Sequence, residues 1–210
     1  MGESERALER TGGLERWLAG ASRRIHLIGV AGSGMSGIAG LLLAMGHRVS
    51  GSDKVRTIEV TRLCAIGLNF HTPSCADIVK EAELVVYSSA IRSSHPDFVC
   101  AIKCGKTVVR RAEALAALLA ARRGIVVAGM HGKTTTASMV AHVLRGGGLN
   151  PSHYVGAEIP VLGTNAHWNP LGEWFVAEGD ESDGTLALYK TEHSIVLNIE
   201  EEHLDYYKDL

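Results

Sequence analysis

The feature that most constrains the fold of this chain is residues 129–136, Gly-Met-His-Gly-Lys-Thr-Thr-Thr, together with their neighbours. The apolar run 124–128 precedes them, and residues 137–144 follow with the apolar spacing of a helix. A strand, a glycine turn ending in Gly-Lys-Thr and a helix are the layout of a phosphate-binding loop, where backbone N–H groups and the helix dipole attract an anion. The sequence therefore predicts a nucleotide site in an α/β fold.

Residues of this loop are suited to separate tasks. Gly132 lets the backbone approach a phosphate, Lys133 can reach the β- and γ-phosphates, and Thr134 can place its hydroxyl on Mg²⁺. The full Walker pattern has a glycine where Val127 stands, so a helix N-terminus with a threonine cap and an exposed lysine is the alternative. The predicted nucleotide site comprises Gly129, Met130, His131, Gly132, Lys133, Thr134 and Thr135.

A second glycine-rich turn lies near the N-terminus, between the apolar run 25–30 and a helical segment that extends to Met45. It contains Gly32-x-Gly34-x-x-Gly37, which is typical of a dinucleotide-type βαβ unit. A strand follows and ends at Asp53, where this motif places an acid that contacts ribose. These features predict a site for a nucleotide diphosphate without deciding which nucleotide it binds.

Strands and helices alternate up to residue 122 and predict a parallel sheet with right-handed crossovers. Ligands bind at the carboxyl ends of such strands, where the glycine loop, Asp53, Ser88 and Ser89 fall. His71 also ends a predicted strand, although a lone histidine there is more often structural. The predicted strands are 68–71, 83–88 and 107–110, and the predicted helices are 58–66, 96–103 and 111–122.

Arg122, Arg123 and Gly124 form the expected join to a second domain, because a second phosphate loop needs its own sheet. Three divisions are predicted: an extension over 1–22, a Rossmann-like domain over 23–123 and a P-loop domain over 124–210. Further strands are expected at 154–159, 174–177 and 194–199.

Acidic clusters follow the last two of these strands, at 178–183 and 200–205. Carboxylates at a strand end beside a phosphate loop suit Mg²⁺ that is shared with nucleotide phosphates. A solvated acidic turn is the alternative. Glu178 comes directly after its strand and is the preferred metal ligand.

Composition limits the classes of partner. The net charge of −2 provides no basic surface for nucleic acid or for an anionic membrane. No apolar run approaches membrane-spanning length and the N-terminus lacks a secretory apolar region, so a cytoplasmic protein is expected. The four cysteines form no Cys-x-x-Cys pair and are expected to be small buried residues.

Gly-Met-Ser-Gly-Ile-Ala at 34–39, followed by His-Gly-Lys-Thr-Thr-Thr at 131–136, resembles the Mur ligase family. The resemblance extends through nearly all of residues 25–210. Its further segments are 51–53, 85–91, 110–113, 163–166, 177–184 and 198–205. The implied fold is α/β, with a Rossmann-like parallel-sheet N-terminal domain followed by an incomplete P-loop α/β ATP-binding domain.

The resemblance implies that the first domain binds the UDP part of UDP-N-acetylmuramate. The glycine loop would hold the diphosphate, with Asp53 and His71 around the uridine. The implied set of UDP-sugar contacts is Gly32, Gly34, Met35, Ser36, Gly37, Asp53, His71, Ser88 and Ser89. The second domain would bind ATP and Mg²⁺, with Lys133, Glu178 and His203 as catalytic residues and Thr134, Glu178 and His203 as metal contacts.

The implied reaction activates the muramyl carboxylate with ATP to an acyl phosphate, which the amine of L-alanine then attacks. This chain departs from the family's pattern at Met130, where a threonine is usual, and at Glu202, where an aspartate is usual. The family also continues beyond Leu210 with the rest of the ATP domain and a third domain. These 210 residues are therefore expected to be inactive alone.

Three other functions remain open at this point. A related ligase attaches a recycled peptide to the same sugar nucleotide, and a non-catalytic remnant would bind the sugar nucleotide without turnover. An NAD-dependent Rossmann oxidoreductase would also use Gly32, Gly34, Gly37 and Asp53. The loop at 129–136 argues against the oxidoreductase, which has no use for a second phosphate loop.

Overall fold

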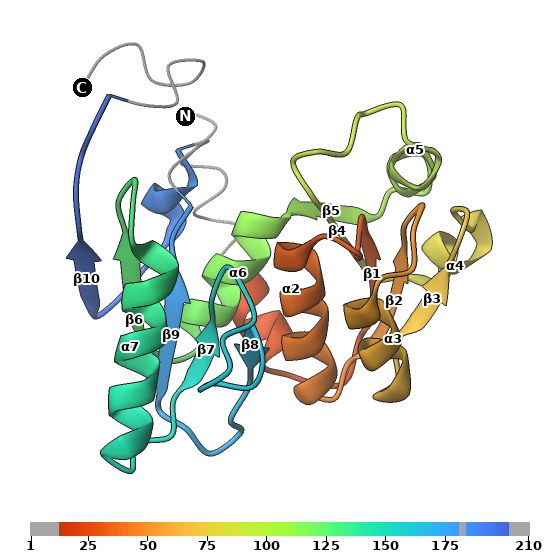
Figure 1. Cartoon of the computed structure of the whole chain (residues 1–210). Coiled ribbons are helices and arrows are strands. Elements are labelled where there is room, and N and C mark those ends of the chain that lie inside the picture. The colour runs from red at the N-terminus through yellow and green to blue at the C-terminus, as the bar shows by residue number, and fades with distance from the viewer. Residues whose placement is uncertain (1–12, 181–183, 202–210) are drawn as a thin grey trace. The chain divides into compact units, whose positions relative to one another are not determined.

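The computed structural model of the chain describes residues 13–180 and 184–201, which divide into two compact units (Figure 1). Residues 20–114 form the N-terminal unit, and the described residues 13–19, 115–180 and 184–201 form the C-terminal unit. The division falls inside helix α6 (Arg111–Ala120). The boundary expected at residues 123 and 124 stays a prediction.

Five parallel strands form the sheet of the N-terminal unit, in the order β3-β2-β1-β4-β5. The strands are β1 (Arg24–Ile28), β2 (Arg48–Ser52), β3 (Asn69–His71), β4 (Leu84–Tyr87) and β5 (Thr107–Arg110). The connecting helices are α2 (Ser33–Ala44), α3 (Ile58–Ala65), α4 (Ala76–Glu81) and α5 (Pro96–Lys103).

Right-handed crossovers place α2 and α3 on one face of this sheet and α4 and α5 on the other. In agreement, α2 contacts α3 and α4 contacts α5. The strand order reverses between β1 and β4, as in a doubly wound nucleotide-binding fold. The predicted Rossmann-like parallel sheet is therefore confirmed.

Local sequence explains where several of these helices begin. Thr57 caps α3, because its hydroxyl accepts the Val60 N–H at 3.3 Å. Pro96 occupies the first turn of α5, where its missing N–H and fixed φ cost nothing. The short helix α4 was not predicted from the sequence.

The C-terminal unit has a second five-stranded sheet, in the order β10-β6-β9-β7-β8. All neighbours in it are parallel except β7 and β8, which are antiparallel. Helix α7 contacts both β6 and β9, so that Ala137 and Ala141 join Val127 and Val176 in one apolar cluster. The elements are β6 (Arg123–Ala128), α7 (Lys133–Gly146), β7 (Ser152–Tyr154), β8 (Ala166–His167), β9 (Trp174–Glu178), the 3₁₀ helix η1 (Thr185–Leu188) and β10 (His193–Val196).

The strand expected at residues 154–159 is wrong, because β7 ends at Tyr154. Beyond that point the backbone leaves the sheet pairing. The N–H of Val155 donates to the carbonyl of Asn165 at 2.8 Å, and the N–H of Gly156 donates to the carboxylate of Glu178 at 2.6 Å.

The cysteines are also less buried than expected: Cys64, Cys75 and Cys100 are partly exposed, and Cys104 is exposed. All four are free thiols. Among the residues that the structure describes, no helix combines the length and apolar character needed to cross a membrane.

His153 on β7 is a fully buried histidine. Its Nε2–H donates to the carbonyl of Thr164 at 3.2 Å, while its Nδ1 is buried and has no hydrogen-bond partner within residues 13–180 and 184–201. Burial lowers the pKa of His153 from 6.5 to about 4, because the charged imidazolium would lose its hydration.

This shift predicts acid sensitivity of the C-terminal unit. The folded pKa lies below the unfolded value, so the unfolded chain takes up a proton first as the pH falls below 6.5. The free energy of unfolding should fall between pH 6.5 and about 4, by at most about 3 kcal/mol from this group. Urea unfolding at a series of pH values should show a shallower pH dependence for His153→Gln. His142→Gln, at an exposed position on α7, should behave as wild type. Equal slopes for His153→Gln and wild type would contradict this account.

Candidate functional site

A pocket of about 1000 Å³ lies at the carboxyl ends of the strands in the N-terminal unit. Its walls come from the chain segments that follow β1, β2, β3 and β4. The lining residues are Gly29, Gly32, Ser52, Asp53, Lys54, Thr72, Pro73, Ser74, Ser88, Ala90, Ile91, Arg92, Ser94, His95 and Pro96. The pocket therefore occupies the reversal of strand order between β1 and β4, where doubly wound sheets bind ligands.

The N-terminus of α2 faces this pocket through its N-cap residue, Gly32. As a glycine, this N-cap residue has no side chain that could cap the helix, and the first turn contains no acidic residue. Helices α3, α4 and α5 each carry an acid there, namely Glu59, Asp77 and Asp97. The positive end of the α2 dipole is thus not offset by a carboxylate in its own first turn, which suits an anionic ligand.

Asp53 joins the end of β2 to the glycine loop. Its Oδ2 accepts the N–H of Ala31 at 2.9 Å, and its Oδ1 accepts the N–H of Lys54 at 2.6 Å. Ser88 on the neighbouring wall accepts the N–H of Ala90 at 3.3 Å. Of the predicted contacts, the structure therefore brings Gly32, Asp53 and Ser88 together around one pocket.

The other predicted UDP-sugar contacts are not among the lining residues: Gly34, Met35, Ser36, Gly37, His71 and Ser89. Met35 is buried in the core, and the Ser36 hydroxyl donates to the carbonyl of Ser33 within the helix. His71 is half-buried at the end of β3, where its Nε2 has no hydrogen-bond partner in the part of the chain that the structure describes. Their roles in ligand binding stay predictions.

Sequence reasoning missed most of the pocket's charged and loop residues. Lys54 and Arg92 add positive charge to the lining, and His95 adds a ring that can donate a hydrogen bond. The segment Thr72–Ser74 follows β3. The sequence marks these residues as pocket residues only by their position, since each of them comes shortly after a predicted strand.

In the C-terminal unit, the loop between β6 and α7 carries the Gly-Lys-Thr sequence. Gly129 and Gly132 have φ values of +127° and +83°, which favour glycine. Gly132 is the N-cap of α7, and this helix also lacks a side-chain cap and a first-turn acid. The Lys133 ammonium group folds back over the loop and donates to the carbonyl oxygens of Gly129 at 2.6 Å and Met130 at 3.3 Å.

Asn198, just after β10, holds this loop in place. Its side-chain oxygen accepts the N–H of His131 at 2.9 Å, and its side-chain nitrogen donates to the carbonyl of His131 at 3.0 Å. These paired bonds connect the loop to the neighbouring strand end. Sequence reasoning did not identify Asn198 as a site residue.

Glu178 ends β9, which is the neighbour of β6. The Thr134 hydroxyl lies 3.0 Å from Glu178 Oε1 and 2.9 Å from Oε2, and Oε2 also accepts the N–H of Gly156. A Cβ at position 156 would lie 2.6 Å from Oε2 and 3.1 Å from the Thr134 hydroxyl oxygen. Only glycine therefore leaves room at this point for a group shared by Thr134 and Glu178.

This arrangement fits a hard cation. Mg²⁺ prefers oxygen ligands and is usually bound through one or two carboxylates, with phosphates and water as the other ligands. The Thr134 hydroxyl and the Glu178 carboxylate supply such oxygens next to the phosphate loop. Over residues 13–180 and 184–201 no group of three or more His, Cys, Asp or Glu side chains could hold a metal alone. His203, a predicted metal contact, lies outside the described residues.

Comparisons with known proteins agree with this geometry. Residues 24–123 match the model of the Mur ligase family, catalytic domain. The chain is 48% identical over 189 residues to UDP-N-acetylmuramate–L-alanine ligase of Syntrophobacter fumaroxidans, covering 90% of this chain and 40% of that protein. It is 46% identical over 184 residues to the ligase of the same name from Renibacterium salmoninarum, covering 88% and 39%. The chain thus spans about two fifths of the length of these curated relatives.

Solved structures give the same similarity. UDP-N-acetylmuramate–alanine ligase from Thermotoga maritima superposes with a TM-score of 0.82 at 28% identity, over 90% of this chain and 44% of that one. A second match is UDP-N-acetylmuramate:L-alanyl-γ-D-glutamyl-meso-diaminopimelate ligase from Neisseria meningitides. Its TM-score is 0.79 at 30% identity, over 90% of this chain and 64% of that one.

The geometry of the loop after β6 predicts a large effect of Gly129→Ala. The new Cβ would lie 3.0 Å from the backbone N and O of Asn198, and alanine disfavours a φ of +127°. The free energy of unfolding of the C-terminal unit should fall by about 1–3 kcal/mol in a urea titration. Gly146→Ala is the matched control, since nothing lies within 4 Å of that Cβ position, and it should not destabilise the unit. A Gly129→Ala protein as stable as wild type would contradict the assigned loop conformation.

Proposed function

Since this chain belongs to the Mur ligase family, we propose that its two phosphate loops serve an ATP-dependent ligase that joins L-alanine to UDP-N-acetylmuramate. One observation carries the proposal. Each unit contains a glycine loop that leads into a helix without a side-chain cap or a first-turn acid. Two such anion sites in one chain suit a reaction between two phosphorylated substrates.

The N-terminal unit takes the sugar nucleotide in this proposal. Its pocket of about 1000 Å³ has the uncapped end of α2 on one wall and the cationic side chains of Lys54 and Arg92 on others. A diphosphate at Gly32 would meet the helix dipole and these charges together. Asp53 then lies beside the nucleoside, with His71 on the next strand.

The C-terminal unit takes ATP and Mg²⁺. Lys133 would exchange its loop carbonyl partners for β- and γ-phosphate oxygens, while other backbone N–H groups of the loop, apart from that of His131, would face the phosphates. Thr134 and Glu178 would hold Mg²⁺, and we assign His203 as a further contact. When bound, the ion supplies positive charge that reduces the repulsion between the phosphate and the approaching carboxylate.

The chemistry then proceeds in two displacements. The muramyl carboxylate oxygen attacks the γ-phosphorus of ATP, which breaks the bond to ADP and gives an acyl phosphate. The amine of L-alanine attacks the acyl carbon, expels inorganic phosphate and loses a proton to form the amide. Catalysis of this kind depends on placement and charge neutralisation, so it requires no side-chain nucleophile.

Two alternatives are weaker. The first alternative is a ligase that attaches a peptide, as the name of the Neisseria protein indicates. Such a ligase would use the same sugar nucleotide and would differ only in the amine that is joined to it. The identity of 46–48% to L-alanine ligases favours L-alanine. An NAD-dependent oxidoreductase leaves the second phosphate loop unexplained. With ATP and a UDP-sugar as substrates, we place the reaction in the cytoplasm, as a step of peptidoglycan synthesis.

Ligand-induced stabilisation tests the assignment of the first pocket. UDP-N-acetylmuramate should raise the melting temperature of the chain, because a ligand at 100 times its Kd adds about 2.7 kcal/mol to the stability of the unit that binds it. NAD at the same concentration should leave the melting temperature unchanged. Stabilisation by NAD and not by UDP-N-acetylmuramate would overturn the proposed function.

The division of labour between the loops predicts selective effects of Lys133→Ala. Loss of the charge-assisted contact to phosphate should weaken ATP binding in the presence of Mg²⁺ by about 10- to 100-fold. UDP-N-acetylmuramate affinity should not change, because its site lies in the other unit. Isothermal titration calorimetry measures both, with Lys190→Ala at an exposed position of the C-terminal unit as control. Loss of sugar-nucleotide affinity in Lys133→Ala would show that the loops are assigned wrongly.

A further inference from the structure

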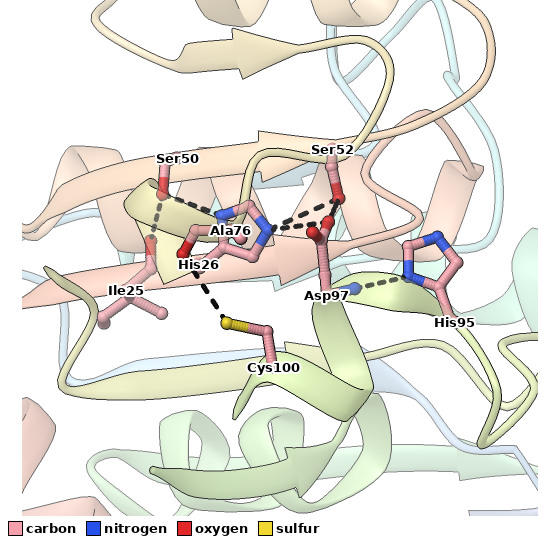
Figure 2. Close-up of polar contacts among 8 residues, drawn as sticks. All are labelled: Ile25, His26, Ser50, Ser52, Ala76, His95, Asp97 and Cys100. Atoms are coloured by element: carbon pink, nitrogen blue, oxygen red, sulfur yellow. Dashed lines mark hydrogen bonds and ion pairs between the residues drawn. The ribbon is translucent and has the colours of Figure 1, made fainter. Parts of the chain in front are cut away.

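A buried polar cluster lies inside the N-terminal unit. It comprises His26 on β1, Ser50 and Ser52 on β2, and Asp97 in the first turn of α5. Figure 2 shows the His26 ring between Ser50 and the Ser52–Asp97 pair. His26 is 0% exposed and Asp97 is 1% exposed. Neither residue has a part in the function proposed above.

The hydrogen bonds of this cluster indicate which of its atoms carry a proton. The Ser52 hydroxyl donates to Asp97 Oδ2 at 2.5 Å. His26 Nε2 lies 3.5 Å from the same carboxylate oxygen and 3.4 Å from the Ser52 oxygen, so Nε2 has to carry a proton in order to bind either one. Burial opposes ionisation of Asp97, but the hydrogen bonds from His26 and Ser52 prevail and lower its pKa.

A contribution to fold stability does not by itself explain why these polar side chains are buried. Ile25, Leu27 and Ile28 of β1 are buried and apolar, as expected for a central parallel strand, and His26 interrupts them. Asp97 Oδ1 is buried without a hydrogen-bond partner among the described residues. Even a buried ion pair can often be replaced by apolar side chains of similar volume without loss of stability, so the burial of this His26–Asp97 contact needs another explanation.

The cluster connects elements whose ends form the pocket. β1 leads into Gly29, Ser52 is itself a lining residue that precedes Asp53, and Asp97 follows His95 and Pro96. The N–H of Asp97 also donates to His95 Nδ1 at 3.3 Å. Since Nδ1 accepts this bond, the neutral ring carries its proton on Nε2 and can donate it to a ligand.

We propose that Asp97 is a positioning residue for the sugar nucleotide, acting through Ser52 and His95. Its carboxylate ties the end of β2 to the first turn of α5 and thereby sets the spacing between two walls of the pocket. Its backbone N–H keeps the His95 ring oriented as a donor. His26 Nε2 lies 3.5 Å from the same carboxylate oxygen that accepts the Ser52 hydroxyl. This inference rests on the assignment of the pocket to UDP-N-acetylmuramate.

The test is a double-mutant cycle on the 210-residue chain, with UDP-N-acetylmuramate affinity measured by calorimetry. Asp97→Asn keeps the side-chain shape and should weaken binding about tenfold, and the smaller change Ser52→Ala should weaken it several-fold. The double variant should bind about as weakly as Asp97→Asn alone, because both changes break the same link. Asp77→Asn, at the equivalent first-turn position of α4, is exposed and should bind as wild type.

Two further readouts separate positioning from simple stabilisation. The melting temperature of Asp97→Asn should fall, because the change breaks buried contacts, so affinities are measured at a temperature where each variant is folded. ATP affinity in the other unit should be unchanged. A lowered melting temperature with unaltered UDP-N-acetylmuramate affinity would make Asp97 structural only and overturn the inference, as would independent losses in the double variant. A wild-type chain that does not bind UDP-N-acetylmuramate would instead refute the proposed function and, with it, this role of Asp97.

Discussion

Both candidate sites depend on one electrostatic constraint, the absence of acidic side chains from the first turn of the helix after each glycine loop. Serine, threonine or aspartate at the N-cap typically adds about 1 kcal/mol to stability. At Gly32 and Gly132 the chain forgoes that contribution and leaves α2 and α7 without a side-chain cap. The N-terminal unit uses ordinary capping elsewhere, as at Thr57 before α3. Helix α4 also lacks a side-chain cap, but its first turn contains Asp77, so the combination of a glycine N-cap with an acid-free first turn distinguishes α2 and α7 from α3, α4 and α5 and is consistent with anionic ligands.

Two carboxylates near these sites, Asp97 and Glu178, differ in what surrounds them. Asp97 is buried, its Oδ2 accepts the Ser52 hydroxyl, and His26 Nε2 lies 3.5 Å from the same oxygen. Glu178 receives hydrogen bonds from neutral groups only, the Thr134 hydroxyl and the Gly156 N–H, among its described contacts. A carboxylate held by neutral donors retains its attraction for a cation, whereas one already paired with a histidine serves the geometry of its surroundings.

Local sequence signals predicted the helices and the loops well, and long-range contacts account for what they missed. Helix α5 has the predicted bounds, because Pro96 starts it and its apolar spacing is clear. The short strand β7 could not be placed, because its end depends on contacts of Val155 and Gly156 with residues far along the chain. For the sites, glycine spacing identified both loops. Asn198 and His95 were missed because their roles depend on tertiary contacts that no local motif encodes.

The folded-back position of Lys133 has a thermodynamic consequence for ligand binding. Its ammonium group already donates to two loop carbonyls, and these hydrogen bonds have to break before the group can reach a phosphate. The favourable enthalpy of phosphate binding is therefore reduced by the bonds that are given up. The affinity for a nucleotide at this loop reflects an exchange of partners, and it will be lower than a sum of the new contacts suggests.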